Sequence, residues 1–498
     1  MRRGVIITCS VLCPVLFTVF PMLSLFADNQ SEVELSLLSR PLLVGIVAAL
    51  ALFGVFFLIT KRFANAGVLA SVVVVGFLFE GVFFGQTVFW FLLLWLATIV
   101  AAVVAVLRSR RDLVNVVAIL TVAAAAMVVP QVVNVVTWQA SHSLPSATDP
   151  RLWPTSLEVP NVPSGVRPPD IYVIIPDDYA RADVLQEYFH YDNSEFLTQL
   201  EQRGFIVSVD NRSPYSDSES NVASLLNMDY LTNFGNVLGD ESQDVRLVKR
   251  VSEDNRAARL LSSIGYDYIQ LDTDEVSFAG GNPGISSFAA PDSFANLLMR
   301  KTILREIGGP IGFDQSATEA RYRDAIRSEF AKLGAIPDGP RPKFVVFHTL
   351  IPHDPYVYDE RGRSVTYRAD ADIDLSSDAG RAAYIRQLRY TSQLLLDAVD
   401  QILANATTPP VIVIAADEGF QAEPEVFGEA AGREIRVKGL SAFYLPGLDH
   451  PSLPDPPNSV NDLRIVFNDY LGTHYAMLDS VSYAEGDFPY QGEEIDVT

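Results

Sequence analysis

The sequence predicts a bundle of membrane-spanning helices followed by an α/β domain. Two patterns predict this architecture: long apolar runs fill the first third of the 498 residues, and short β-rich runs alternate with helical patterns in the rest. A third observation, the positions of the basic residues, predicts the side of the membrane on which the α/β domain lies. We therefore expect residues 1–138 to form a membrane anchor, residues 139–168 a linker and residues 169–498 a globular domain.

Five apolar runs in the predicted anchor are each long enough to cross a bilayer. A spanning helix needs roughly 20 residues, at about 1.5 Å rise each, to cross about 30 Å of hydrocarbon with its backbone polar groups bonded internally. The runs cover residues 4–27, 41–60, 67–84, 88–107 and 113–137. The sequence thus predicts a multi-pass protein of about five transmembrane helices.

Basic residues between these runs predict the orientation. Three clusters fall on one side of the membrane if the chain crosses it five times, namely Arg2 with Arg3, Lys61 with Arg62, and Arg108 with Arg110 and Arg111. The positive-inside rule makes that side cytoplasmic, so the chain after Gln139 lies outside the cytoplasm. A cleaved signal peptide over the first run is the alternative, and it leaves the orientation unchanged. We expect a cytoplasmic (inner) membrane protein with an extracytoplasmic C-terminal domain.

The predicted outer domain is acidic and contains no cysteine. Only 8 of the 37 Lys and Arg residues and 5 of the 60 Asp and Glu residues precede Ala140, which leaves 29 basic and 55 acidic residues after it. This balance excludes attraction to nucleic acid or anionic lipid by charge. The two cysteines, Cys9 and Cys13, lie in the first apolar run, so the outer domain folds without disulfides.

The linker and the globular domain differ in composition. Residues 145–169 contain seven prolines, which favours an extended connector. Beyond it, β-rich runs at residues 171–175, 205–209, 344–347, 411–415 and 440–445 alternate with helical patterns at residues 194–203, 255–264, 318–333, 380–404 and 460–471. Such alternation predicts a sheet with helices on both faces.

Polar side chains follow three of the predicted strands. They are Asp177 and Asp178 after the first, His348 and His353 after the third, and Asp417 and Glu418 after the fourth. Acidic pairs at such places commonly cap helices, but functional groups of open α/β sheets also gather past the carboxyl ends of strands. Four carboxylates at one sheet edge need a cation to be stable. Their hard oxygens predict Mn²⁺ or Mg²⁺, with Ca²⁺ as the next choice and Zn²⁺ disfavoured.

A hydroxyl-rich run, residues 213–220, leads into a predicted helix near residues 221–228. The free N–H groups and the dipole at a helix N-terminus favour an oxyanion, so a serine here is a candidate nucleophile. N-capping by one of the serines explains the same pattern without catalysis. Helix geometry separates neighbours by about 100°, so only one of Ser216, Ser218 and Ser220 is expected to face the metal.

Five motifs in order carry a resemblance to a known family. They are Asp-Ile-Tyr-Val-Ile-Ile-Pro-Asp177, Asn193-Ser-Glu-Phe-Leu with Arg203-Gly-Phe, Tyr215-Ser-Asp-Ser-Glu-Ser-Asn-Val-Ala-Ser-Leu-Leu-Asn227, Pro352-His353-Asp-Pro-Tyr356, and Asp417-Glu418-Gly419. From Pro169 onward the chain resembles the sulfatase-like branch of the alkaline phosphatase superfamily. With its helical anchor it is similar to membrane-anchored lipoteichoic acid synthases and phosphoethanolamine transferases, which move phosphoryl-linked head groups between envelope molecules.

The resemblance implies an alkaline-phosphatase/sulfatase-like sheet sandwiched by helices and a role for each matching residue. Asp177, Asp417 and Glu418 would bind the metal, and Ser218 stands where the family keeps the nucleophile that also contacts the metal. His353 and His348 would contact the anionic group or the leaving oxygen. Membrane lipids and an envelope lipid-linked or glycan substrate are the implied partners.

Two departures from the family pattern open an alternative. Glu418 replaces a histidine ligand, which would leave an all-oxygen site, and Asp178 replaces a glycine. The sulfatase signature is absent around Ser218 and no outer cysteine exists to become formylglycine, so a phosphate ester fits better than a sulfate ester. We expect a metal-dependent hydrolase or transferase. The alternative is a catalytically silent domain that binds an envelope glycan or a partner protein.

Overall fold

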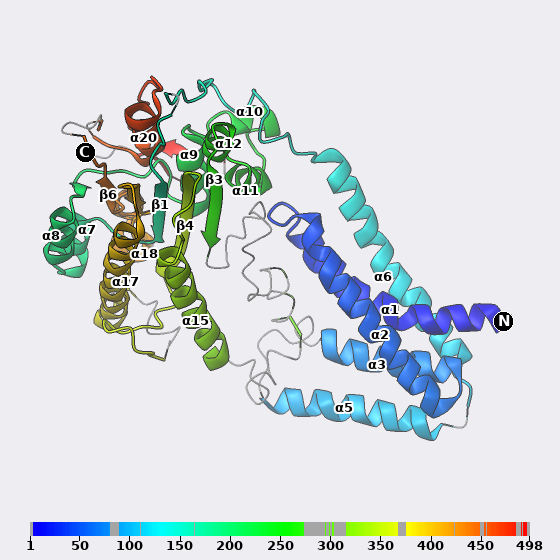
Figure 1. The fold of residues 1–498 in the computed structure, drawn as a ribbon. Helices are drawn as coiled ribbons and strands as arrows, with labels where there is room; N and C mark the ends of the chain where they lie inside the picture. Colours follow the sequence, from blue (N-terminus) through cyan, green and yellow to red (C-terminus); the bar gives the residue numbers. More distant parts are fainter. Residues whose placement is uncertain are drawn as a thin grey trace. The chain divides into compact units, whose positions relative to one another are not determined.

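The computed structural model describes residues 3–79, 89–109, 111–163, 165–272, 315–366, 375–422, 424–448, 456–484 and 492–495, with single positions at 294, 298, 301–302, 453–454 and 490. The chain divides into two compact units, Met1–Leu144 with Ala290–Thr318, and Pro145–Ala289 with Glu319–Thr498. The first unit is helical and the second contains the main sheet (Figure 1).

The helical unit contains the predicted apolar helices. They are α1 (Arg3–Asp28), α2 (Ser39–Thr60, after the short η1, Leu35–Leu38), α3 (Phe63–Leu78), α5 (Phe89–Arg108) and α6 (Val114–Ser141). Arg3–Asp28, Leu35–Thr60 and Val114–Ser141 are long and apolar enough to cross a membrane, whereas the apolar helices Phe63–Leu78 and Leu93–Arg108 are shorter. The end of the expected run 67–84, and Arg2 and Arg110 of the basic clusters, lie outside the described residues. The membrane character of this region is confirmed, and the number of five crossings stays a prediction.

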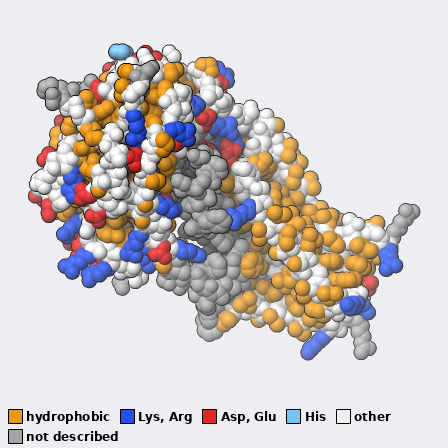
Figure 2. Space-filling model, in the orientation of Figure 1, with side chains coloured by type: hydrophobic (Ala, Val, Ile, Leu, Met, Phe, Trp, Pro, Cys, Tyr) orange, Lys and Arg blue, Asp and Glu red, His pale blue; other side chains and the backbone are white. Residues whose placement is uncertain are grey.

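These helices are apolar on both their inner and outer sides. Leu43, Ile119 and Val122 are 65–70% exposed, and Figure 2 shows many hydrophobic side chains on the visible described surface of this unit. Helices that are apolar all round are typical of a membrane environment. Inside the bundle, a Cβ on Gly67 would overlap the backbone of Ser10, so this glycine allows α3 and α1 to pack closely.

The globular unit is built on a six-stranded sheet. Its strands are β1 (Ile171–Asp177), β2 (Ile206–Ser208), β3 (Asp267–Asp272), β4 (Lys343–Pro352), β5 (Val411–Ala415) and β6 (Ser441–Tyr444), in the order β2-β6-β5-β1-β4-β3. The central strand β1 is parallel to β4 and β5, and β3 is parallel to β4, whereas β6 is antiparallel to both of its neighbours. Each of the five predicted strands is present. β3 falls in a segment where we predicted no strand.

Helices cover both faces of this sheet, as predicted (Figure 1). Tyr172 and Ile174 of β1 belong to one core, together with residues of α7 (Ala182–Phe189), α8 (Ser194–Gln202), α15 (Gln315–Gly334) and α17 (Asp378–Asn405). Ile171, Val173 and Ile175 belong to the other core, with α9 (Ser218–Asn227), α12 (Arg256–Ser263) and α20 (Asp462–Leu471). Because side chains alternate along a strand, a parallel sheet with two covered faces needs a continuous apolar run.

Shorter elements complete the globular unit: α10 (Phe234–Leu238), α11 (Arg246–Glu253), α18 (Pro424–Phe427), α19 (Glu429–Arg436), η3 (Ser459–Asn461), β7 (Tyr483–Ala484) and β8 (Glu493–Glu494). Part of the predicted linker packs against this unit. The ring of Trp153 meets that of Phe234 edge to face at 5.4 Å, and the backbone N–H of Asn161 donates to the backbone oxygen of Leu471 at 3.0 Å. These contacts hold the linker against the surface of the globular unit.

Candidate active site at the carboxyl edge of the sheet

Three neighbouring parallel strands bring the candidate residues together. Asp177 is the last residue of β1, Asp417 follows the end of β5, and His348 lies within β4, opposite Ile175 in the strand register. Because β1 lies between β4 and β5, the side chains that leave this edge converge over β1. All three residues are almost completely buried.

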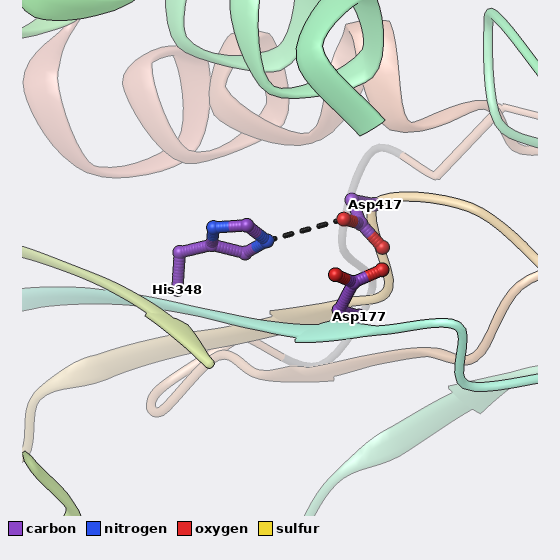
Figure 3. A group of neighbouring side chains, drawn as sticks. All are labelled: Asp177, His348 and Asp417. Atoms are coloured by element: carbon purple, nitrogen blue, oxygen red, sulfur yellow. Dashed lines mark hydrogen bonds and ion pairs between the residues drawn. The ribbon is translucent and has the colours of Figure 1, made fainter. Parts of the chain in front are cut away.

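Asp177, His348 and Asp417 form the first group of possible metal ligands (Figure 3). One ligand atom from each lies within 4.8 Å of the others. The His348 Nε2 atom is 3.1 Å from Oδ2 of Asp417, while Oδ1 of Asp417 accepts from the backbone N–H of Glu418 at 2.7 Å. We expected His348 to contact the substrate, and that role stays a prediction; the structure places this imidazole beside Asp177 and Asp417, where it could also bind a metal.

Asp177 also belongs to a second group, with Asp178 and Glu418, whose ligand atoms satisfy the same distance limit. Asp178 adopts a left-handed backbone conformation with φ of +62°. A glycine adopts this conformation most easily, and aspartate is one of the few other residues that tolerate it. The residue that replaces the family's glycine therefore keeps the turn and adds a carboxylate to the site.

The oxygens of this second group have the properties that a cation site requires. Oδ1 of Asp177, Oδ1 of Asp178 and Oε2 of Glu418 are buried and have no hydrogen-bond partner among the described residues. Burial, together with the charge of Asp417, raises the pKa of Asp177 and Glu418 well above the usual range and that of Asp178 to about 7. Unpaired buried carboxylates are costly, and a divalent cation would remove that cost. The residues present therefore fit a bound metal.

The candidate nucleophile touches this group. Ser218 begins α9, and its Oγ donates to Oε1 of Glu418 at 3.2 Å. The helix cap is Asp217, whose side chain accepts from the backbone N–H of Ser220 at 2.8 Å. Because the carboxylate of Asp217 caps the helix, N-capping by a serine does not explain the hydroxyl-rich run. A cavity of about 320 Å³ is lined by Ser218, Glu418 and the neighbouring Tyr215.

His353 lies at the edge of the site, in the segment after β4. Its Nδ1 atom is 2.6 Å from the backbone oxygen of Asp354 and 3.2 Å from that residue's carboxylate. Burial acts to lower the pKa of His353, but the charges of Asp178, Asp177 and Asp354 outweigh it and raise the pKa to about 10. In the absence of a bound metal, His353 is therefore a cation at neutral pH.

Two residues of the site were missing from the set predicted as ligands or substrate contacts. Asp178 was expected only to add charge and bulk beside the metal, and Arg436 was not considered. Arg436 ends α19 and lines the cavity together with Ser218. No sequence signal marks it, because it lies 18 positions after Glu418 in a segment without a motif.

The fold and the site together describe a membrane-anchored protein with an acidic, serine-containing site at the edge of an α/β sheet. No family model matches the chain, and no curated protein matches it. Among solved structures, it is similar to the C-terminal periplasmic domain of EptC from Escherichia coli, in complex with zinc (11% identity, 69% of this chain and 96% of that chain, TM-score 0.43).

Two further solved structures are similar. Lipooligosaccharide phosphoethanolamine transferase A from Neisseria meningitidis, an integral membrane protein, is 11% identical over 89% of this chain and 88% of that chain, with a TM-score of 0.38. An alkaline phosphatase superfamily protein from Vibrio parahaemolyticus is 15% identical over 70% of this chain and 80% of that chain, also with a TM-score of 0.38. These descriptions name the groups that the sequence motifs resemble.

Proposed function

We propose that this protein is a membrane-anchored, metal-dependent enzyme that hydrolyses or transfers phosphate esters of envelope lipids or glycans, with Ser218 as the nucleophile. One observation carries the proposal: Glu418 accepts a hydrogen bond from the Ser218 hydroxyl with one oxygen and leaves its other oxygen buried without a partner in the described part of the chain. A hydroxyl at a helix N-terminus, one carboxylate away from a cation site, is suited to attack phosphorus.

The proposed ligands are Asp177, His348 and Asp417 for one ion and Asp177, Asp178 and Glu418 for a second. A divalent metal bound there would lower the pKa of the serine hydroxyl and neutralise charge on the phosphate. The predominance of carboxylate oxygens favours Mn²⁺ or Mg²⁺. The nitrogen of His348 makes the first group more tolerant of Zn²⁺ than the all-oxygen site that we expected.

The reaction proceeds in two displacements. Oγ of Ser218 attacks phosphorus and its proton passes to Glu418. The bond from phosphorus to the leaving oxygen breaks, and the protonated form of His353 gives that oxygen a proton. An acceptor hydroxyl or water then attacks the seryl phosphate and gives its proton to His353. The bond between Oγ and phosphorus breaks, and Ser218 recovers its proton from Glu418. Both side chains end in their starting protonation states.

The anchor and its charges complete the proposal. Five crossings with the three basic clusters in the cytoplasm would place the globular unit outside it. Held at the membrane surface, the site would meet lipid-linked donors and acceptors at high local concentration, and the acceptors would compete with water for the seryl phosphate. The acidic charge of this unit gives nucleic acid no favourable surface.

The test uses the full chain in detergent, assayed with bis-p-nitrophenyl phosphate and Mg²⁺, Mn²⁺, Ca²⁺ or Zn²⁺. We expect metal-dependent turnover that Ser218→Ala and Asp417→Asn abolish. Ser220→Ala is the matched control and should retain turnover, because the N–H that Ser220 gives to the helix cap belongs to its backbone. Metal binding that depends on Asp417, without turnover of any ester, would instead support the catalytically silent alternative.

A further inference from the structure

Arg436 is a cation with unused hydrogen-bonding capacity beside the candidate nucleophile. Its Nη1 donates to the backbone oxygen of Ser216 at 3.3 Å, and its Nε is buried without a hydrogen-bond partner among the described residues. A guanidinium has five N–H donors, so most of its donors are unused within the described part of the chain. Buried donors in folded proteins are nearly always bonded to protein, water or ligand.

The cavity beside Ser218 makes this cation available to a ligand. Arg436 is the only Lys, Arg or His among the described residues that line the cavity of about 320 Å³. Glu418 lines the same cavity, and its Oε1 accepts the hydrogen bond from Ser218. Glu219 also lines the cavity, but its carboxylate is already paired with Lys249 at 3.3 Å. Among the described residues Arg436 forms no ion pair with a carboxylate.

A backbone hydrogen bond fixes the position of Arg436 relative to the segment that carries Asp417 and Glu418. The backbone N–H of Gly419 donates to the backbone oxygen of Arg436 at 2.6 Å. A Cβ at Gly419 would overlap the backbone oxygens of Ile435 and Lys438. The segment that carries Asp417 and Glu418 therefore fits against the end of α19 only with glycine at position 419, which couples the position of Arg436 to that of the metal ligands.

We infer that Arg436 binds the tetrahedral anionic group of the substrate, with its free N–H groups directed to the phosphoryl oxygens that do not react. This inference deepens the proposed function and rests on it. The four carboxylates would offset two divalent ions, so the charge of the phosphoryl group is left to nearby cationic side chains, of which Arg436 is the one that lines the cavity in the described part of the chain. Arginine suits this role, because its planar group matches two oxygens of a phosphate at once.

The test measures binding of inorganic phosphate to the full chain in detergent by calorimetry, with Mn²⁺ present. We expect Arg436→Gln to raise the Kd for phosphate by about 10- to 100-fold, the range for losing a hydrogen bond between charged groups. Arg436→Lys, which keeps the charge, should recover part of this loss. The matched control is Arg433→Gln on the same helix, whose side chain pairs with Glu429 and Glu493 and should leave the Kd unchanged.

Affinity for Mn²⁺, measured on the same variants, separates a binding role from a structural one. Affinity for Mn²⁺ should not fall in Arg436→Gln, because this side chain is a cation and no metal ligand. Loss of both Mn²⁺ and phosphate binding would overturn the inference by showing that Arg436 only supports the fold. Wild-type phosphate affinity in Arg436→Gln, or no phosphate binding to the wild-type chain, would overturn it too. If phosphate binding depends on Arg436 but no ester turns over, the proposed function fails alone. Turnover with unchanged KM in Arg436→Gln would refute the inference alone.

Discussion

The buried carboxylate of Asp178 predicts that the metal-free protein loses stability as the pH rises. Asp178 is 2% exposed, and burial is the main cause that raises its pKa from 3.8 to about 7. Between these two values the folded chain holds a proton that the unfolded chain has released, so the free energy of unfolding falls by about 1.4 kcal/mol per pH unit. The total from this residue is about 4 kcal/mol, lost between about pH 4 and pH 7.

Asp178→Asn isolates this effect. Asparagine tolerates the left-handed backbone conformation at this position, φ +62°, but does not ionise. We would measure urea unfolding of both proteins by near-ultraviolet circular dichroism from pH 4.5 to 8, in EDTA. Relative to wild type, the variant should gain stability by several kcal/mol as the pH rises toward 7, and Mn²⁺ should reduce or reverse the gain. A stability difference that does not depend on pH in EDTA would refute the reasoning.

Two further substitutions test interactions that stabilise the globular unit, namely the cap of α9 and a buried ion pair. Asp217→Ala removes the cap of α9, in which the Asp217 side chain accepts a hydrogen bond from the backbone N–H of Ser220. This change should lower the free energy of unfolding by about 1 kcal/mol in thermal unfolding, and Asp217→Asn should restore it. An unchanged midpoint in Asp217→Ala would contradict this role of the cap. Arg256→Gln breaks a buried ion pair with Asp229 (3.1 Å) and should cost about 3–5 kcal/mol in urea unfolding. The control Arg259→Gln, in a pair that is more accessible to solvent, should cost less than about 1 kcal/mol, and equal losses would show that burial does not matter.

The sheet could be predicted where its strands are buried on both sides. β1, β4 and β5 lie inside the sheet and each contains a continuous apolar run, which the sequence displays directly. β3 is an edge strand with the sequence Asp-Tyr-Ile-Gln-Leu-Asp, in which polar residues interrupt the apolar ones, so no long apolar run marks it. Tertiary pairing with β4 defines this strand more strongly than its own composition does.

The site could be predicted where residues follow strand ends, and less well elsewhere. Asp177 and Asp417 were expected at one sheet edge, and the structure brings them together, although their role as ligands stays a prediction. His348 was expected after the end of the strand, whereas β4 continues to Pro352 and the imidazole lies beside Asp417. Arg436 could not be found from the sequence, because only the packing of α19 against the segment around Gly419 brings it to the cavity.

The membership of Asp177 in both ligand groups means that two ions would not bind independently. The first ion would take up the charge of this carboxylate and would repel a second dication a few ångströms away, so the second ion would bind more weakly. Filling of the site with rising metal concentration would then be anticooperative and would occur in two stages. When metal is scarce, the protein with one bound ion would predominate. Binding of the second, more weakly held ion would then set the fraction of the protein with both ions in place.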